Sequence, residues 1–261
     1  EGVCKLCGKS LSRSYEHTPP KAAFNDTGVL EMRADYVLGL ESKPLQYLDE
    51  HKGRINQRGA GGFTLCGPCN SKTGSWYASK YSDFSHVLMQ SMRDRGSAEG
   101  LIARIKFCPL NVLKQIVLMT LTSNPDPFRQ LNPDLVEFVE NRNCQYLPRR
   151  YGIYIALFNL DSSRLSRTSG LVGRADLETG MVYTYSEVAF PPLVNVLTVD
   201  SPKPDVRLVK VNWFRHYKFD EVVDHPLSLM KLPVVSPFPG DYRDEEELRA
   251  TVAEGSEAGL K

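Results

Sequence analysis

The sequence predicts an α+β protein in which a small cysteine-stapled module precedes a larger domain with an antiparallel sheet. Three observations lead to this prediction. Two Cys-x-x-Cys pairs stand near the start of the chain, two helical segments follow, and the chain then turns to strand-like segments separated by turns. We divide the chain into a module at residues 1–82, a domain at residues 83–240 and an acidic tail at residues 241–261.

The composition is that of an ordinary folded protein. The chain has 261 residues, of which 41% are hydrophobic, and its formal net charge is +1. A charge this close to neutral gives no general attraction to polyanions, so any affinity for nucleic acid must come from local placement of basic residues. The longest clean apolar run, residues 153–158, is far shorter than the ~20 residues of a membrane span. We therefore expect a cytoplasmic protein with no membrane partner.

Four of the six cysteines form the two pairs, Cys4 with Cys7 and Cys66 with Cys69. Two thiolates three positions apart on a tight turn can bind one Zn²⁺ at ~2.3 Å, and a second such turn completes a closed tetrahedral shell, which is typical of structural zinc. A disulfide framework and a thioredoxin-like redox pair are the alternatives. Neither pair stands in the βαβ pattern of a redox site. We therefore predict one structural zinc ion on these four cysteines.

The segment between the two pairs, or knuckles, contains an acidic residue beside a histidine. Glu16 and His17 are followed by Pro19 and Pro20, a short strand-like stretch leads into the second knuckle, and a helix is expected to start near Asn70. The order along the chain is therefore knuckle, Glu-His pair, strand, knuckle and helix.

This order resembles the zinc-ribboned HNH endonucleases, whose pattern is C-x-x-C, then E/D-H-x-x-P, then L-C-x-x-C-N. The matching residues are Cys4, Cys7, Glu16, His17, Pro20, Leu65, Cys66, Cys69 and Asn70. The resemblance covers about residues 1–80. It implies a ββα-metal, treble-clef-like fold that holds one catalytic divalent ion and hydrolyses phosphodiester bonds of DNA, in a restriction or phage-defence setting.

The residue types suit this chemistry. A histidine with an ordinary pKa of ~6.5 can accept a proton from water near neutral pH, and a carboxylate is a ligand that Mg²⁺ or Mn²⁺ accepts. The resemblance implies that His17 is the general base, that Glu16 binds the catalytic metal, and that Asn70 stands where the family has its last His or Asn ligand. Neighbours in a strand point to opposite faces, so Glu16 and His17 serve one site only if the strand ends or bends there. Pro19 and Pro20 favour such an end.

The chain departs from the family pattern at two positions. Gly61 stands where the family has its middle Asn, with Asn56 as the nearest substitute, and Asn70 is an uncharged ligand where His is usual. These departures leave an alternative open, namely a catalytically inactive zinc module that binds nucleic acid or a protein partner. A different phosphodiesterase chemistry, on RNA or on a nucleotide, also stays open.

Three basic residues near the Glu-His pair are predicted to contact phosphates: Arg54, Arg58 and Lys72. Arg54 and Arg58 flank a Gly-rich loop that allows close approach of a nucleic-acid strand. Trp76 and Tyr77 have rings that can stack on bases, but at helical spacing beside a knuckle they are better explained as the core of the module.

For the rest of the chain, the sequence predicts secondary structure but indicates no function. Apolar spacing predicts helices at residues 110–121 and 133–139. Residues rich in Val, Ile, Tyr and Phe predict strands at residues 151–159, 180–190, 193–199 and 206–219. We assign this domain to recognition of substrate or of a protein partner, and a homodimer would allow both DNA strands to be cut. The acidic run after Asp241 predicts a solvated helix or loose tail.

Overall fold

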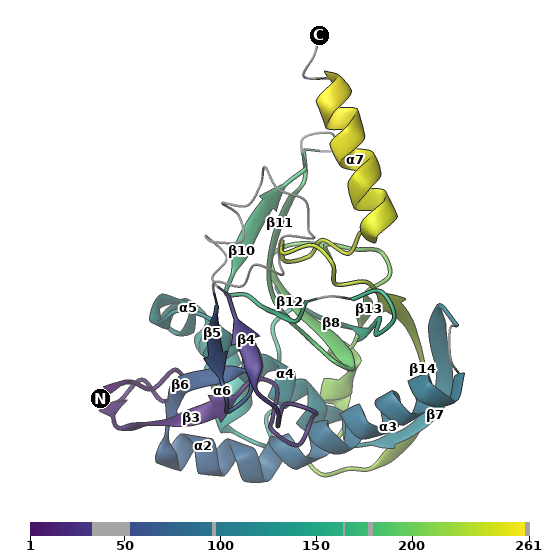
Figure 1. Cartoon of the computed structure of the whole chain (residues 1–261). Helices are drawn as coiled ribbons and strands as arrows, with labels where there is room; N and C mark the ends of the chain where they lie inside the picture. Colours follow the sequence, from purple (N-terminus) through teal and green to yellow (C-terminus); the bar gives the residue numbers. More distant parts are fainter. Residues whose placement is uncertain (33–52, 96–97, 164, 177–179, 259–261) are drawn as a thin grey trace.

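The computed structural model describes residues 1–32, 53–95, 98–163, 165–176 and 180–258, and it shows helices packed against one large sheet (Figure 1). The predicted α+β class is confirmed. Within the described ranges, none of the helices combines the length and the apolar character needed to cross a membrane.

Three small antiparallel strand pairs form the N-terminal part of the chain. They are β1 (Gly2–Val3) with β2 (Ser10–Leu11), β3 (Arg13–His17) with β6 (Gly61–Cys66), and β4 (Val29–Glu31) with β5 (Arg54–Asn56). The pair β3–β6 positions the candidate site, because β6 runs directly into the second knuckle.

One continuous helical rod follows the second knuckle. It consists of α2 (Gly67–Thr73), the π-helical turn η2 (Gly74–Ala78) and α3 (Ser79–Arg95). The predicted helix near Asn70 is thus present, with a proline in its first turn, where the missing N–H has no helical partner to lose. A stripe of side chains at most 2% exposed holds the rod to the core; its members are Tyr77, Tyr81, Phe84 and Leu88.

Three further helices follow: α4 (Pro109–Ser123), α5 (Asp126–Leu131) and α6 (Pro133–Glu140). The helices predicted at residues 110–121 and 133–139 are confirmed. Every residue of α4 from Pro109 to Thr122 is buried, because the helix is mostly apolar and enclosed by the fold.

The large sheet has eight strands, six of them in the order β10-β11-β12-β8-β14-β7, with β13 paired to β8 and β9 to β11. Their bounds are β7 (Gly100–Phe107), β8 (Tyr151–Phe158), β9 (Arg167–Thr168), β10 (Val172–Ala175), β11 (Val182–Phe190), β12 (Leu193–Val199), β13 (Val209–Lys210) and β14 (Val223–Leu232). The predicted antiparallel sheet is present in part: the sheet is mixed, because β14 pairs with β8 in parallel at Lys231 and Leu232. A long crossover connects β8 to β14, as parallel neighbours require.

The predicted strands at residues 151–159, 180–190 and 193–199 are confirmed as β8, β11 and β12. The predicted strand at residues 206–219 is wrong: it contains only β13 and then a 3₁₀ helix, η3 (Asn212–His216). The Asn212 side chain explains the break. Its amide donates to the Tyr151 carbonyl at 2.7 Å and accepts from the Ile153 N–H at 2.8 Å, so it replaces a ladder pair and lets the backbone turn.

The N-terminal part and the sheet-containing part share one hydrophobic core. The cluster of buried residues that includes Leu6 and Leu65 also includes Ile116 of α4 and Ile153 of β8. Polar contacts join the same regions, since Lys5 Nζ donates to the Thr122 carbonyl at 2.7 Å. The predicted boundary at residue 82 lies inside α3, and the division into separate parts stays a prediction.

The segment before the last helix is held by a buried ion pair. Arg167 Nε donates to Glu187 Oε1 at 2.8 Å, and Glu187 also accepts the Tyr242 hydroxyl at 2.6 Å. Asp241 and Tyr242, predicted to open a tail, are therefore buried. The final helix, α7 (Glu245–Ala258), projects away from the sheet (Figure 1).

Candidate functional site

The structure brings the four predicted zinc ligands together. The Sγ atoms of Cys4, Cys7, Cys66 and Cys69 all lie within 4.8 Å of one another. All six cysteines are free, which excludes the disulfide framework. The Sγ atoms of Cys7 and Cys66 are 3.9 Å apart, close to the ~3.8 Å that a tetrahedron with 2.3 Å zinc–sulfur bonds requires. The cluster can hold a zinc ion with a closed shell of sulfur.

Local backbone geometry forms each knuckle. In the first, Cys4 N–H donates to the Lys9 carbonyl and Gly8 N–H to the Cys4 carbonyl, both at 2.9 Å. Gly8 has a φ of 74°, a left-handed conformation that glycine adopts without a Cβ penalty. The second knuckle joins the last residue of β6, Cys66, to the first turn of α2, which contains Cys69.

The protein surroundings act differently on the pKa values of Cys4 and Cys69. Burial would raise the pKa of Cys4, but backbone N–H groups of Cys66, Cys7 and Leu6 point at its sulfur and lower the pKa to about 7. Burial raises the pKa of Cys69, and the neighbouring thiols add to this effect. A divalent ion at the centre would reverse the second effect, because a coordinating thiol is deprotonated outright.

The pair Glu16–His17 lies at the end of strand β3, as the two prolines after it predict. β3 ends at His17, which pairs with Gly61, while Glu16 pairs with Gly62. The helix after the second knuckle is tied to the same strand, since Asn70 Nδ2 donates to the Ser14 hydroxyl at 2.9 Å and to the Tyr15 carbonyl at 3.0 Å. Strand end and helix start are thereby fixed to each other.

Glu16 lies between Tyr15 and His17, whose rings meet on one face of β3, so strand alternation places the Glu16 side chain on the other face. Burial raises the pKa of its carboxyl to about 7. No hydrogen bond or ion pair reaches this carboxylate from the described residues, and none of them supplies a counter-charge to it. A carboxylate withdrawn from water in this way is stabilised by a bound cation.

His17 lies on the opposite face, where its ring meets the Tyr15 ring edge-on with centroids 5.1 Å apart. Its Nε2 is 2.9 Å from the Arg58 carbonyl oxygen. A carbonyl only accepts, so Nε2 carries the proton and the lone pair of a neutral ring lies on Nδ1. Burial lowers the pKa of His17, opposed by the Arg58 carbonyl and assisted by the charges of Lys21 and Arg58. The ring is therefore mostly a neutral base at pH 7.

Gly61 leaves no room for the middle asparagine of the HNH pattern. Its φ is 153°, and a Cβ built on it would lie 2.1 Å from the Glu16 carbonyl oxygen. Asn56, the nearest substitute along the chain, donates instead to the Tyr15 hydroxyl and to Glu31, each at 2.7 Å. Asn56 thus supports the His17 face and not the Glu16 face.

A residue missed by the sequence analysis, Asn25, connects the loop after β3 to the start of β6. It is 1% exposed. Its amide donates to the carbonyls of Pro19 and Ala60 at 2.7 and 2.8 Å and accepts the Ala60 N–H at 2.7 Å. A single loop asparagine gives no periodic signal, so only the folded loop reveals this role.

The three predicted phosphate-binding residues are placed differently. The Arg58 guanidinium lies 5.5 Å from the Tyr15 ring, on the His17 side. Arg54 is exposed on β5, opposite Glu31. Lys72 Nζ is 3.8 Å from the Glu140 carboxylate. At about 100° per residue, Lys72 lies about 200° around the helix from Asn70, so its side chain points away from the candidate site.

Comparisons with known proteins gave no match among family models, curated proteins or solved structures.

Proposed function

We propose that this chain is a metal-dependent endonuclease of the HNH type that hydrolyses phosphodiester bonds of DNA. One observation carries the proposal: the end of β3 offers a histidine with one fixed tautomer on one face and, on the other face, a carboxylate that no described residue pairs, beside a helix that the four-cysteine cluster holds in place. These are the groups that hydrolysis of a phosphodiester needs.

In the proposed reaction His17 is the general base. Its Nδ1 takes a proton from a water molecule whose oxygen forms a bond to phosphorus, and the bond from phosphorus to the 3′ oxygen breaks. The 3′ oxygen takes a proton from solvent, so the products carry a 5′-phosphate and a 3′-hydroxyl. The hydrogen bond to the Arg58 carbonyl orients the ring and stabilises its protonated form after the transfer.

Glu16 and Asn70 are the residues that would hold Mg²⁺ or Mn²⁺. Glu16 supplies a carboxylate, and the Nδ2 of Asn70 is committed to β3, which leaves its carbonyl oxygen as a hard donor. When bound, the ion supplies positive charge for the phosphate and the leaving oxygen. Arg54 and Arg58 would bind neighbouring phosphates without reading sequence.

The test is plasmid cleavage with a matched histidine control. Purified protein is incubated with supercoiled plasmid and Mg²⁺ or Mn²⁺, beside His17→Ala and His216→Ala; His216 is exposed on η3. We expect nicking by the unaltered protein and by His216→Ala. His17→Ala should be slower by roughly 100-fold or more, the typical contribution of a general base.

The inactive zinc module is the second candidate, and the lack of space at Gly61 favours it. Binding of DNA or of a protein partner without cleavage under any divalent ion would support it and contradict the proposed activity. Cleavage that persists undiminished in His17→Ala would contradict the role given to this residue.

A further inference from the structure

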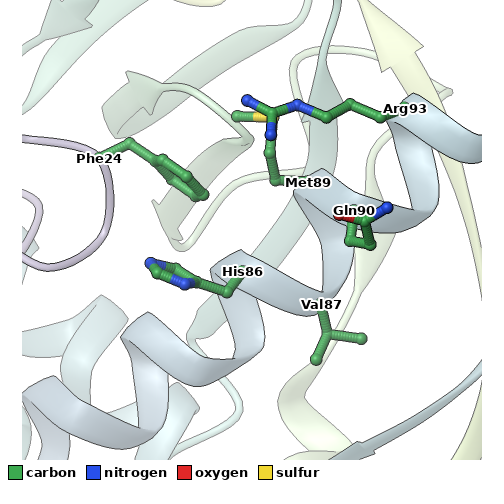
Figure 2. A pocket seen from close by; sticks show the side chains of 6 residues that line it. All are labelled: Phe24, His86, Val87, Met89, Gln90 and Arg93. Atoms are coloured by element: carbon green, nitrogen blue, oxygen red, sulfur yellow. The ribbon is translucent and has the colours of Figure 1, made fainter.

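A pocket of about 350 Å³ lies between the loop that follows β3 and the outer face of α3 (Figure 2). One loop residue lines it, Phe24, together with five residues of α3: His86, Val87, Met89, Gln90 and Arg93. None of these six belongs to the candidate site at the end of β3. The volume is at the lower end of the ~300–1,000 Å³ range of small-ligand pockets.

Aromatic side chains form the loop side of the pocket. The Phe24 and His86 rings stack with centroids 4.6 Å apart and planes 29° apart, and His86 Nε2 donates to the Ala22 carbonyl at 2.7 Å. Phe24 has a φ of 63°, which costs a residue with a side chain of order 1 kcal/mol or more and persists only where the surroundings fix it. The flat walls are therefore positioned before any ligand arrives.

Polar groups on α3 complete the pocket. Gln90 Nε2 donates to Asp94 at 2.7 Å, so its carbonyl oxygen remains as an acceptor. The Arg93 guanidinium has no hydrogen bond or ion pair in the described part of the chain. Figure 2 shows its side chain extending past Met89 toward Phe24. Such a pocket suits a nucleic-acid base and its phosphate: the base can stack on the aromatic wall, and the guanidinium can contact the phosphate.

The pocket is connected to the candidate site by covalent and hydrogen-bonded structure. Phe24 precedes Asn25, whose side chain is hydrogen-bonded to the carbonyls of Pro19 and Ala60 beside the end of β3. Lys21 is exposed on the same loop, and its charge acts on His17. Along the helical rod, Asn70 and His86 are about 24 Å apart at 1.5 Å per residue. A nucleic-acid strand leaving the candidate site along this loop meets a lysine and then the pocket.

We propose that this pocket holds one unstacked base of the substrate strand, about 24 Å along the helical rod from Asn70, with Arg93 on an adjacent phosphate. The inference rests on the proposed nuclease function and specifies its substrate class. A base paired inside a duplex cannot enter a pocket of this size, so the strand must be single-stranded or frayed at this position.

Binding to the His17→Ala protein tests the pocket without cleavage. Fluorescence anisotropy compares a labelled single-stranded 20-mer with its blunt duplex, and we expect roughly tenfold tighter binding of the single strand. Arg93→Ala should weaken single-strand binding about fivefold and reduce the slope of log affinity against log salt by about 0.7, because one phosphate contact is lost. Phe24→Leu keeps apolar volume but removes the ring, so it should weaken binding about fivefold with the salt slope unchanged.

The control is Arg149→Ala, an exposed arginine before β8 that is not among the residues lining this pocket; the variant should bind as the parent does. If Arg93→Ala and Phe24→Leu both bind single strands as the parent does, at equal melting temperatures, the pocket does not bind the base. That result would overturn this inference without affecting His17-dependent nicking. If the unaltered protein does not nick plasmid but its single-strand binding depends on Arg93, the proposed nuclease function is overturned and the binding role of the pocket is supported.

Discussion

At the scale of single residues, Lys114 is an unusual member of the core. It is 0% exposed on α4. Its ammonium donates to the carbonyls of Phe138 and Asn141, where α6 ends, and lies 3.9 Å from the centroid of the Phe138 ring. It thereby satisfies carbonyls that the end of a helix leaves without partners. Burial lowers its pKa to about 7.

This pKa predicts a dependence of stability on pH. Above about pH 7 the folded chain releases the Lys114 proton, whereas the unfolded chain keeps it until its ordinary pKa near 10.5. The unfolded state then binds more protons, so the free energy of unfolding should rise with pH across this window. Between pH 7 and pH 9 we expect a rise of about 2 kcal/mol relative to Lys114→Met, measured by urea unfolding at both pH values.

Comparing the two proteins cancels the titration of the cysteines and of other shared groups. A difference between them that does not change from pH 7 to pH 9 would contradict the lowered pKa of Lys114. A difference that changes in the opposite direction would contradict it as well.

At the scale of elements, the loop that joins β3 to the rest of the N-terminal part depends on Asn25. Removing its side chain leaves the Ala60 N–H and the Pro19 carbonyl without their Asn25 partner, whereas the Ala60 carbonyl keeps the Thr18 N–H. Each buried group left unsatisfied costs about 1–3 kcal/mol, so Asn25→Ala should lower the free energy of unfolding by about 3 kcal/mol. Denaturant unfolding measures this. Asn143→Ala is the matched control, because Asn143 is exposed and should change stability by less than about 0.5 kcal/mol.

Elements whose burial is uniform were predictable from the sequence. β8 and β12 are buried along their whole length, and α4 on all its faces, so apolar composition and length were sufficient signals. β7 and β14 were missed although burial alternates along both, because the apolar Ile102 and Met230 lie at exposed positions and Pro226 interrupts the strand-like composition of β14. The strand predicted at residues 206–219 was wrong because a side chain, Asn212, substitutes for backbone pairing, and composition does not report such a contact.

At the scale of the whole molecule, the cysteine cluster is part of the same core as the sheet and its helices. Cys4, Cys66 and Cys69 belong to the cluster of buried residues that includes Leu113 and Phe214. Loss of the ion would therefore destabilise more than the first 80 residues. We expect one zinc ion per chain by elemental analysis, and a melting temperature that falls by 10 °C or more, as an order-of-magnitude estimate, when a strong chelator removes it.

Cys66→Ser should reproduce the fall in melting temperature, and Cys144→Ser should not, because Cys144 lies outside the four-sulfur group. A zinc-free protein with four titratable thiols in this group and an unchanged melting temperature would contradict the structural role.

The sequence alone was sufficient for the cysteine cluster and for the position of the Glu-His pair at a strand end. Short, regular spacings such as Cys-x-x-Cys place ligands locally, so little of the fold has to be known. Asn25, Phe24 and Arg93 were out of reach for the opposite reason. Each acquires its role only when a loop packs on a helix or strand more than 30 residues away in the chain.

The π-helical turn Gly74–Ala78 has a consequence for how the rod can change over evolutionary time. Such a turn accommodates one more residue than an α-helical turn, and each residue rotates the remainder of the helix by about 100°. Deletion of one residue there would rotate His86 away from the Ala22 carbonyl, whereas Asn70, which precedes the turn, would keep its contacts with β3. Insertions and deletions should therefore be excluded from this stretch.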